Sequence, residues 1–274
     1  MKKLWIVTEL FYPEETSTAF ILTKIANALS DKFDVNVICG PESYCRAALE
    51  DNPSTKLSLD GRIKIHRVSN CNLNKDKIFT RLLRFLIIGF KLSFSLWKNA
   101  KKQDRVFIVT NPAPLLISVA LIKRIKKFPL YILVHDVFPE NTIPAGVISS
   151  DKTFGYKLLR KCFNWAYKSA DCLIVLGRDM RQIMKSKLGK NQNNTKIEII
   201  ENWAENDITQ LNPVNKSKNI VIQYAGNIGR VQGLKSFIQQ YAEAMNPIVS
   251  LELWGDGAMR KELEEYAKEN DVQN

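Results

Sequence analysis

The fold class is decided by the stretch Tyr224-Ala-Gly-Asn-Ile-Gly-Arg-Val-Gln-Gly-Leu-Lys235 and, about twenty residues later, Leu253-Trp-Gly-Asp-Gly-Ala-Met-Arg-Lys-Glu-Leu263. In each stretch an apolar run leads into glycines and then into the start of an amphipathic helix. This pattern is typical of a β-strand that feeds an α-helix. The free N–H groups at a helix start can bind a phosphate. A nucleotide-diphosphate site is therefore a hypothesis from the outset.

The rest of the chain has the same alternation of short β-branched or aromatic runs with longer helical patterns, which predicts an α/β fold with a parallel sheet. Strands are predicted at Leu4–Thr8, Val35–Cys39, Ile63–Val68, Val106–Thr110, Tyr131–Val134, Cys172–Leu176, Ile197–Ile200 and Ile220–Ala225. Helices are predicted at Thr18–Ser30, Arg81–Lys101, Leu115–Lys127, Phe154–Ala170, Arg178–Lys187 and Ala258–Glu269, with a further helix that begins near Leu234.

Two domains are expected, residues 1–202 and residues 203–274. The boundary falls in Glu201–Lys218, where the pattern lapses into Asn, Asp, Pro, Ser and Lys, and this is the linker candidate. Pro41–Gly61 has no clear periodicity, so a loop is predicted there.

Five segments carry a resemblance to a known family. Besides the two glycine stretches, these are Phe11-Tyr-Pro-Glu-Glu-Thr-Ser-Thr18, Leu133-Val-His-Asp-Val-Phe-Pro-Glu140 and Ile199-Ile-Glu-Asn-Trp-Ala204. Together they resemble glycosyltransferase family 4, the retaining nucleotide-sugar enzymes of GT-B architecture. Within it, the chain is most similar to bacterial enzymes of O-antigen or capsule assembly, including fucosamine transferases.

The resemblance implies two Rossmann-like domains. The N-terminal domain would face the acceptor and the membrane, and the C-terminal domain would bind the nucleotide-sugar. Relatives continue with a Glu-x7-Glu motif, which cannot be quoted from this sequence. The second domain is therefore expected to be incomplete, and the activity of the 274 residues alone stays open.

Donor-binding residues follow from the same resemblance. Relatives carry an Arg and a Lys in the first glycine loop, and the nearest register places Asn227 and Gln232 there, with Arg230 between them. Arg230 would neutralise the diphosphate as it departs; the alternative is a surface arginine in a turn. The expected donor-binding residues are Thr16, Ser17, Gly226, Asn227, Gly229, Arg230, Gln232, Gly255 and Gly257.

His135 and Asp136 are the predicted catalytic residues. They directly follow the strand Tyr131–Val134, and the carboxyl ends of parallel strands face the ligand crevice. The resemblance implies that His135 hydrogen-bonds the donor sugar or stabilises its positive character. The alternatives are a structural histidine bonded by its neighbour and, for Thr16, a helix N-cap. His66 lies within a strand pattern and is expected to be structural.

Charge is distributed unevenly along the chain. Residues 1–202 hold 33 Lys and Arg against 18 Asp and Glu, while residues 203–274 hold 7 against 10. Residues 75–127 alone hold 13 basic and 2 acidic side chains, which suits anionic lipids or a pyrophosphate-linked acceptor; a merely solvated basic surface is the alternative. Nucleic acid is not expected as a partner, because no binding motif accompanies the charge.

Residues 78–97 are the nearest approach to a membrane span, but Arg81, Arg84 and Lys91 interrupt them. Charges at the centre of a bilayer cost about 2.5 to 3.5 kcal/mol each. The segment is predicted to be an interfacial helix, a core helix of the first domain, or both.

Neither a metal nor a cofactor is expected. The five cysteines form no CxxC pair, and the sequence contains no Asp-x-Asp or Walker A pattern. The odd cysteine count favours a reducing cytoplasm.

The resemblance, with the charge distribution, therefore implies a cytoplasmic enzyme on the inner face of the membrane. It would transfer a sugar from a nucleotide-diphosphate donor, expected to be a UDP-sugar, to a lipid-linked saccharide in O-antigen or capsule synthesis. The alternative is a truncated, non-catalytic homologue that acts as a membrane-associated binding protein.

Overall fold

The computed structural model describes residues 1–14, 16–42, 58–69, 78–144, 146–189, 195–203, 219–244, 246–270 and 272. The chain divides into two compact units, each with its own hydrophobic core. Unit 1 comprises Met1–Asn141 and Ser150–Trp203, and unit 2 comprises Thr142–Ser149 and Ala204–Asn274. Most of the predicted loop Pro41–Gly61 and of the predicted linker Glu201–Lys218 lies outside the described residues.

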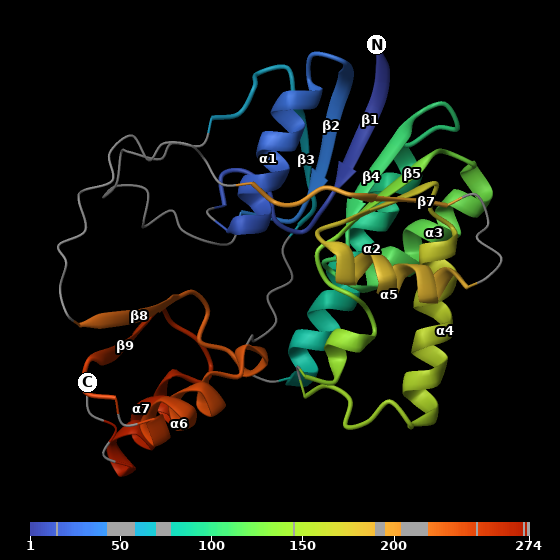
Figure 1. Ribbon diagram of the computed structural model, residues 1–274. Helices are drawn as coiled ribbons and strands as arrows, with labels where there is room; N and C mark the ends of the chain where they lie inside the picture. Colours follow the sequence, from blue (N-terminus) through green and yellow to red (C-terminus); the bar gives the residue numbers. More distant parts are fainter. Residues whose placement is uncertain are drawn as a thin grey trace. The chain divides into compact units, whose positions relative to one another are not determined.

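Unit 1 is built on a seven-stranded sheet in which every neighbouring pair is parallel, in the order β3-β2-β1-β4-β5-β6-β7 (Figure 1). Its strands are β1 (Lys2–Val7), β2 (Phe33–Cys39), β3 (Lys64–Arg67), β4 (Arg105–Val109), β5 (Leu130–Val134), β6 (Cys172–Val175) and β7 (Lys196–Ile199). The seven strands predicted for this part of the chain are confirmed, with ends shifted by one or two residues. Because all run the same way, the residues that follow them gather at one edge of the sheet.

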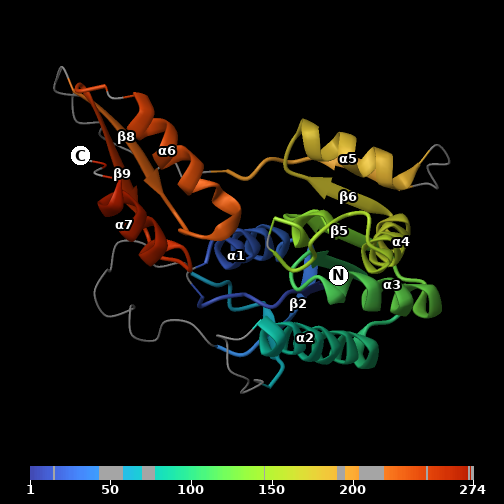
Figure 2. The same ribbon diagram turned by 90° about the horizontal axis from the view of Figure 1, so that it is seen from below.

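Helices cover both faces of this sheet. Leu22 and Ala26 of α1 (Ser17–Leu29) pack in the core on one face. The core on the other face receives side chains from α2 (Ile78–Asn99), α3 (Pro114–Lys126), α4 (Phe154–Lys168) and α5 (Arg178–Leu188). The predicted helices of this unit are confirmed, but α2 begins three residues before the predicted Arg81. Figure 2 shows α2 and α3 side by side beneath the strands.

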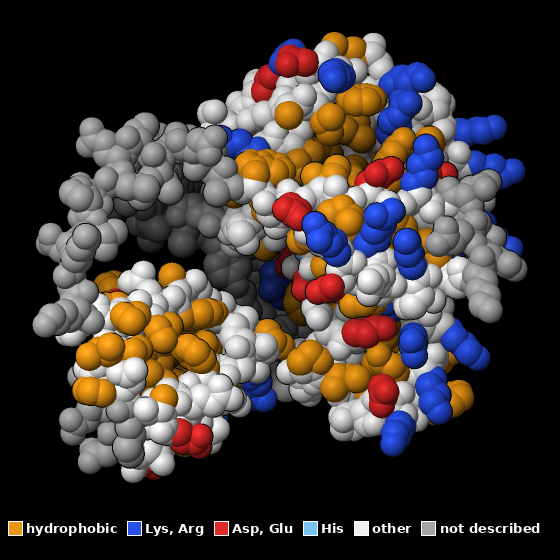
Figure 3. All heavy atoms as spheres, in the orientation of Figure 1, with side chains coloured by type: hydrophobic (Ala, Val, Ile, Leu, Met, Phe, Trp, Pro, Cys, Tyr) orange, Lys and Arg blue, Asp and Glu red, His pale blue; other side chains and the backbone are white. Residues whose placement is uncertain are grey.

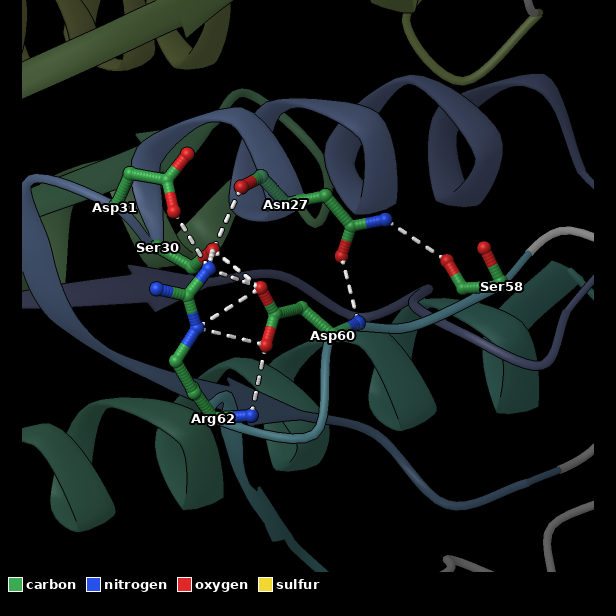
Figure 4. Close-up of polar contacts among 6 residues, drawn as sticks. All are labelled: Asn27, Ser30, Asp31, Ser58, Asp60 and Arg62. Atoms are coloured by element: carbon green, nitrogen blue, oxygen red, sulfur yellow. Dashed lines mark hydrogen bonds and ion pairs between the residues drawn. The ribbon is translucent and has the colours of Figure 1, made fainter.

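A polar network fastens the segment before β3 to the end of α1 (Figure 4). The Asn27 amide donates to the Ser58 carbonyl at 2.8 Å and accepts from the Asp60 N–H at 3.0 Å. The Ser30 hydroxyl donates to the Asp60 carboxylate at 2.7 Å, and Arg62 pairs with Asp60 at 2.5 Å. The hydrogen bonds from Arg62 and Ser30 lower the pKa of Asp60, so this carboxylate remains charged at neutral pH.

Unit 2 contains the parallel pair β8 (Ile220–Ala225) and β9 (Val249–Trp254), the helices α6 (Leu234–Ala244) and α7 (Arg260–Glu269), and a single 3-10 turn, η3 (Arg230–Gln232). The strand predicted at Ile220–Ala225 is confirmed, and α7 begins two residues after the predicted Ala258. The core of the unit consists of Ile228, Leu234, Ile238, Leu251 and Leu263. Hydrophobic side chains also cover much of its visible surface (Figure 3). Ile220, Val221 and Trp254 are among the exposed hydrophobic residues of this unit.

None of the described helices is both long enough and apolar enough to cross a bilayer. The long α2 instead buries Ile88, Leu92 and Leu96 against the sheet.

Candidate functional site

The carboxyl edge of the unit 1 sheet carries the predicted pair His135 and Asp136. The backbone N–H groups of these residues, directly after β5, donate to the Thr110 hydroxyl at 3.1 and 2.9 Å. Thr110 follows the neighbouring strand β4 and is fully buried. One hydroxyl therefore sets the direction in which the chain leaves β5.

One nitrogen of the His135 ring has no hydrogen-bond partner among the described residues. This atom, Nε2, is buried. The Asp136 carboxylate accepts from the Asn141 amide at 2.7 Å. Burial lowers the pKa of His135, and the nearby charge of Asp136 only opposes this effect. The imidazole is therefore neutral at pH 7 and has one buried nitrogen left for a ligand.

The loop after this pair is fixed from α4 and α5. The Lys187 ammonium donates to both Glu140 carboxylate oxygens, at 2.8 and 2.6 Å, and to the Phe138 carbonyl at 3.0 Å. The Tyr167 hydroxyl accepts from the Phe138 N–H at 3.2 Å. Burial lowers the pKa of Lys187, while the hydrogen bond to Glu140 raises it. No local sequence signal marks Lys187, which is 47 positions from Glu140.

The loop after β1 is also fixed by side chains that the sequence analysis missed. Glu9 follows β1 and pairs with Arg84 of α2 at 2.9 Å, and both side chains are almost fully buried. Arg67, at the end of β3, donates to the Tyr12 carbonyl at 2.6 Å. A charged residue that directly follows an apolar strand is the one signal that could have singled out Glu9.

Thr16 and Ser17 lie at the same edge, at the start of α1. The Thr16 hydroxyl caps the helix by accepting from the Ala19 N–H at 3.3 Å. Ser17 is exposed. These hydroxyls therefore lie at the same edge of the sheet as His135, with β4 between β1 and β5. Among the described residues, neither hydroxyl contacts His135.

In unit 2 the two glycine loops lie against each other at the carboxyl ends of β8 and β9. The Gly226 N–H donates to the Trp254 carbonyl at 2.9 Å, and the Ile228 N–H donates to the Asp256 carbonyl at 2.8 Å. A Cβ atom at Gly255 would lie 1.9 Å from the Gly226 carbonyl oxygen, and one at Gly257 would lie 2.3 Å from that of Ile228. Only glycine permits this approach.

The predicted polar side chains of the first loop converge. The amide groups of Asn227 and Gln232 each come within 2.7 Å of the place where Gly229 would carry a Cβ. Arg230 opens η3, just before α6, and is exposed. Its guanidinium has no hydrogen bond or ion pair with any part of the chain that the structure describes. This cation is therefore available to an external anion.

A pocket of about 470 Å³ lies behind these loops, between β9 and the helices α6 and α7. Its lining is mostly apolar and includes Ile238, Leu251 and Leu263. Gly255 is the one predicted donor-binding residue that lines it. The other residues predicted to bind the donor lie outside this pocket.

Comparisons with known proteins, by sequence and by fold, find similar glycosyltransferases. A sequence model of glycosyltransferase family 4 matches residues 21–207. The probable glycosyltransferase WbjE of Pseudomonas aeruginosa is 32% identical over 281 residues, which cover 98% of this chain and 67% of WbjE. Among solved structures, Anabaena HepE in complex with UDP and glucose superposes with a TM-score of 0.61 at 18% identity, covering 100% of this chain and 68% of HepE. The lipopolysaccharide outer core galactosyltransferase WaaB superposes with a TM-score of 0.58 at 14% identity, covering 99% of this chain and 66% of WaaB.

Proposed function

The chain belongs to glycosyltransferase family 4, and from this premise we propose that it transfers a sugar from a UDP-sugar to a lipid-linked saccharide with retention of anomeric configuration. The acceptor hydroxyl attacks the anomeric carbon from the side of the leaving group. The bond to the diphosphate breaks, and the hydroxyl proton passes to the departing phosphate oxygen.

The observation that carries this proposal is the exposed Arg230 guanidinium beside the paired glycine loops of unit 2. Negative charge on the diphosphate grows as the glycosidic bond breaks, so a free cation at this place stabilises the transition state. The Asn227 and Gln232 amides, which converge beside Gly229 in the same loop, offer further hydrogen bonds.

His135 is proposed to contact the donor sugar. Its buried Nε2 has no protein partner among the described residues, and its neutral ring can donate to or accept from a sugar hydroxyl. Asp136 is held by Asn141 next to it and is the second proposed catalytic residue. Thr16 caps α1, so of the hydroxyl pair Ser17 is the better candidate for a donor contact.

A role in O-antigen or capsule synthesis is part of the same proposal. Two observations support it: the likeness to a lipopolysaccharide outer core galactosyltransferase, and the basic region 75–127, which suits a lipid-linked acceptor. A protein in this role acts at the inner face of the membrane, where lipid-linked acceptors are assembled.

The test measures UDP release by the protein with a panel of UDP-sugars and a membrane extract that supplies acceptors, in buffer with EDTA. We expect acceptor-dependent release that persists in EDTA, because Arg230 and the backbone N–H groups replace a divalent ion. We also expect His135→Ala to lower the rate by about a hundredfold, because a hydrogen bond to the donor sugar is lost in the transition state.

His66→Asn is the matched control. His66 lies in β3, where its Nε2 atom is 3.3 Å from the Asn36 amide oxygen. Equal rates for His135→Ala and His66→Asn would remove His135 from the site. An absence of release with every UDP-sugar would overturn the proposed donor class.

A further inference from the structure

The exposed side of α2 is apolar from Leu83 to Trp97. Leu83, Leu86, Phe90, Phe94 and Trp97 are 38%, 57%, 69%, 48% and 39% exposed. Successive residues of an α-helix are about 100° apart, so these five fall within an arc of about 80°. The opposite side of α2 is buried in the core of unit 1. A helix that only packs on a sheet has a polar outer face, and α2 does not.

This apolar stripe continues onto α3. The two helices touch where the Ser93 and Ser118 hydroxyls lie 2.5 Å apart. Next to this contact, Leu121 and Ile125 of α3 are 52% and 65% exposed. The Lys126 ammonium lies 5.2 Å from the centre of the Trp97 ring and donates to the Ala100 carbonyl at 2.7 Å. We call this surface, formed by the five α2 residues with Leu121 and Ile125, the α2–α3 apolar face.

The two helices that form this face contain seven Lys and Arg residues and no acidic ones. Lys98 lies 4.6 Å from the centre of the Phe94 ring, and Lys91 reaches the Ser69 carbonyl at 3.1 Å on the same flank. A second copy of the chain would set one basic surface against another. In an anionic bilayer, by contrast, the apolar side chains can insert between the headgroups while the neighbouring Lys and Arg residues contact the negatively charged lipids.

We infer that the α2–α3 apolar face inserts into the headgroup layer of an anionic membrane, with α2 lying in the membrane plane. This inference deepens the proposed function and rests on it, because the lipid-linked acceptor is taken from that proposal. The Glu9–Arg84 pair, at 2.9 Å, joins the first turns of α2 to the end of β1. The bilayer therefore meets the protein next to the sheet edge that carries His135, so a saccharide can reach this edge while its lipid stays in the membrane.

Vesicle binding tests the inference. The protein is mixed with vesicles of phosphatidylcholine alone or with about a third phosphatidylglycerol, at low and high salt. We expect binding that requires the anionic lipid and weakens with salt. Leu86→Gln/Phe90→Gln should bind at least about tenfold more weakly, because the inserted apolar surface is lost. Brominated lipids should quench tryptophan fluorescence in the wild type and much less in Trp97→Phe.

The matched control is Ile183→Gln/Ile200→Gln, which alters two aliphatic side chains of the same unit that are 41% and 53% exposed and lie outside this face. It should bind like the wild type, and circular dichroism checks the fold of each variant. Equal binding by all proteins would overturn insertion in favour of charge attraction alone. Self-association that the Leu86→Gln/Phe90→Gln change abolishes, without vesicle binding, would assign the face to a second copy.

UDP titration of the same proteins keeps the two proposals separate. The changes on α2 should leave UDP affinity unaltered, since they alter none of the residues proposed to bind the donor. A wild type that binds vesicles but not UDP would contradict the donor proposal alone, and one that binds UDP but not vesicles would contradict the membrane face alone.

Discussion

The Lys187 ammonium lies 2.6 Å from a carboxylate oxygen of Glu140, and the lysine side chain is only 1% exposed. This pair holds the loop that follows His135 and Asp136, because Lys187 also donates to the Phe138 carbonyl in that loop. A buried lysine that satisfies several acceptors at once is expected to contribute to stability as well as to the position of the site.

Replacement of Lys187 by Met tests this contribution. The change keeps the volume but leaves the Glu140 carboxylate and the Phe138 carbonyl without their donor, so the free energy of unfolding should fall by about 3 kcal/mol. Chemical denaturation measures the change. Lys185→Met, on the exposed side of the same helix, is the control and should be neutral. Equal stability of the two variants would show that the loop does not depend on Lys187.

Both histidines should titrate below their ordinary pKa of about 6.5. Burial lowers the pKa of His135, and burial together with Lys3 and Lys64 lowers that of His66. Below pH 6.5 the unfolded chain therefore binds more protons than the folded one, so stability should decrease as the pH falls through this range. NMR titration of labelled histidine measures both values, with His66→Asn for assignment. A His135 pKa at or above 6.5 would mean that the ring is solvated.

Arg230→Ala should weaken UDP binding by about 1.5 to 3 kcal/mol, which corresponds to at least about tenfold, because a charge-assisted hydrogen bond is lost. Calorimetry measures the affinity. Lys268→Ala removes one exposed cation from the last turn of α7 in the same unit and should have no effect. Equal weakening by both changes would point to general charge attraction and not to a specific phosphate contact.

Gly255→Ala should destabilise unit 2 by more than about 2 kcal/mol, because the added Cβ would lie 1.9 Å from the Gly226 carbonyl oxygen and the two loops must separate. The φ angle of 149° at Gly255 adds backbone strain. The change should therefore lower both the melting temperature and the UDP affinity. Gly155→Ala, in open space on α4, is the control. Unchanged UDP affinity in Gly255→Ala would separate the loop contact from donor binding.

Much of the fold follows from local sequence. The runs that form the central strands β4, β5 and β6 are mostly apolar because a parallel sheet with helices on both faces is buried on both sides. The edge strands β3 and β7 contain charged residues and are only partly buried. The position of His135 and Asp136 at the carboxyl edge follows from the strand that precedes them. The two glycine loops are equally local, since each consists of the residues between one strand and one helix.

The hydrogen-bond and ion-pair partners within the site could not be predicted from local sequence. Glu9 and Arg84 are 75 positions apart, and Lys187 and Glu140 are 47 apart, so neither pair has a spacing that predicts it. The hydrogen bonds that the Thr110 hydroxyl accepts from the turn after β5 likewise depend on β4 and β5 being neighbours in the sheet. Such contacts are set by how the elements pack.

The clearest division between sequence and structure concerns α2. Its sequence alone determined a long amphipathic helix with basic residues and left both a core position and a membrane interface open. Packing against the sheet and α3 decided that Leu92 is buried while Phe90, two positions away, is 69% exposed. The sequence does not show whether protein or lipid covers an apolar side chain, because the hydrophobic effect is non-directional. Only the tertiary arrangement of the neighbouring helices distinguishes the two sides.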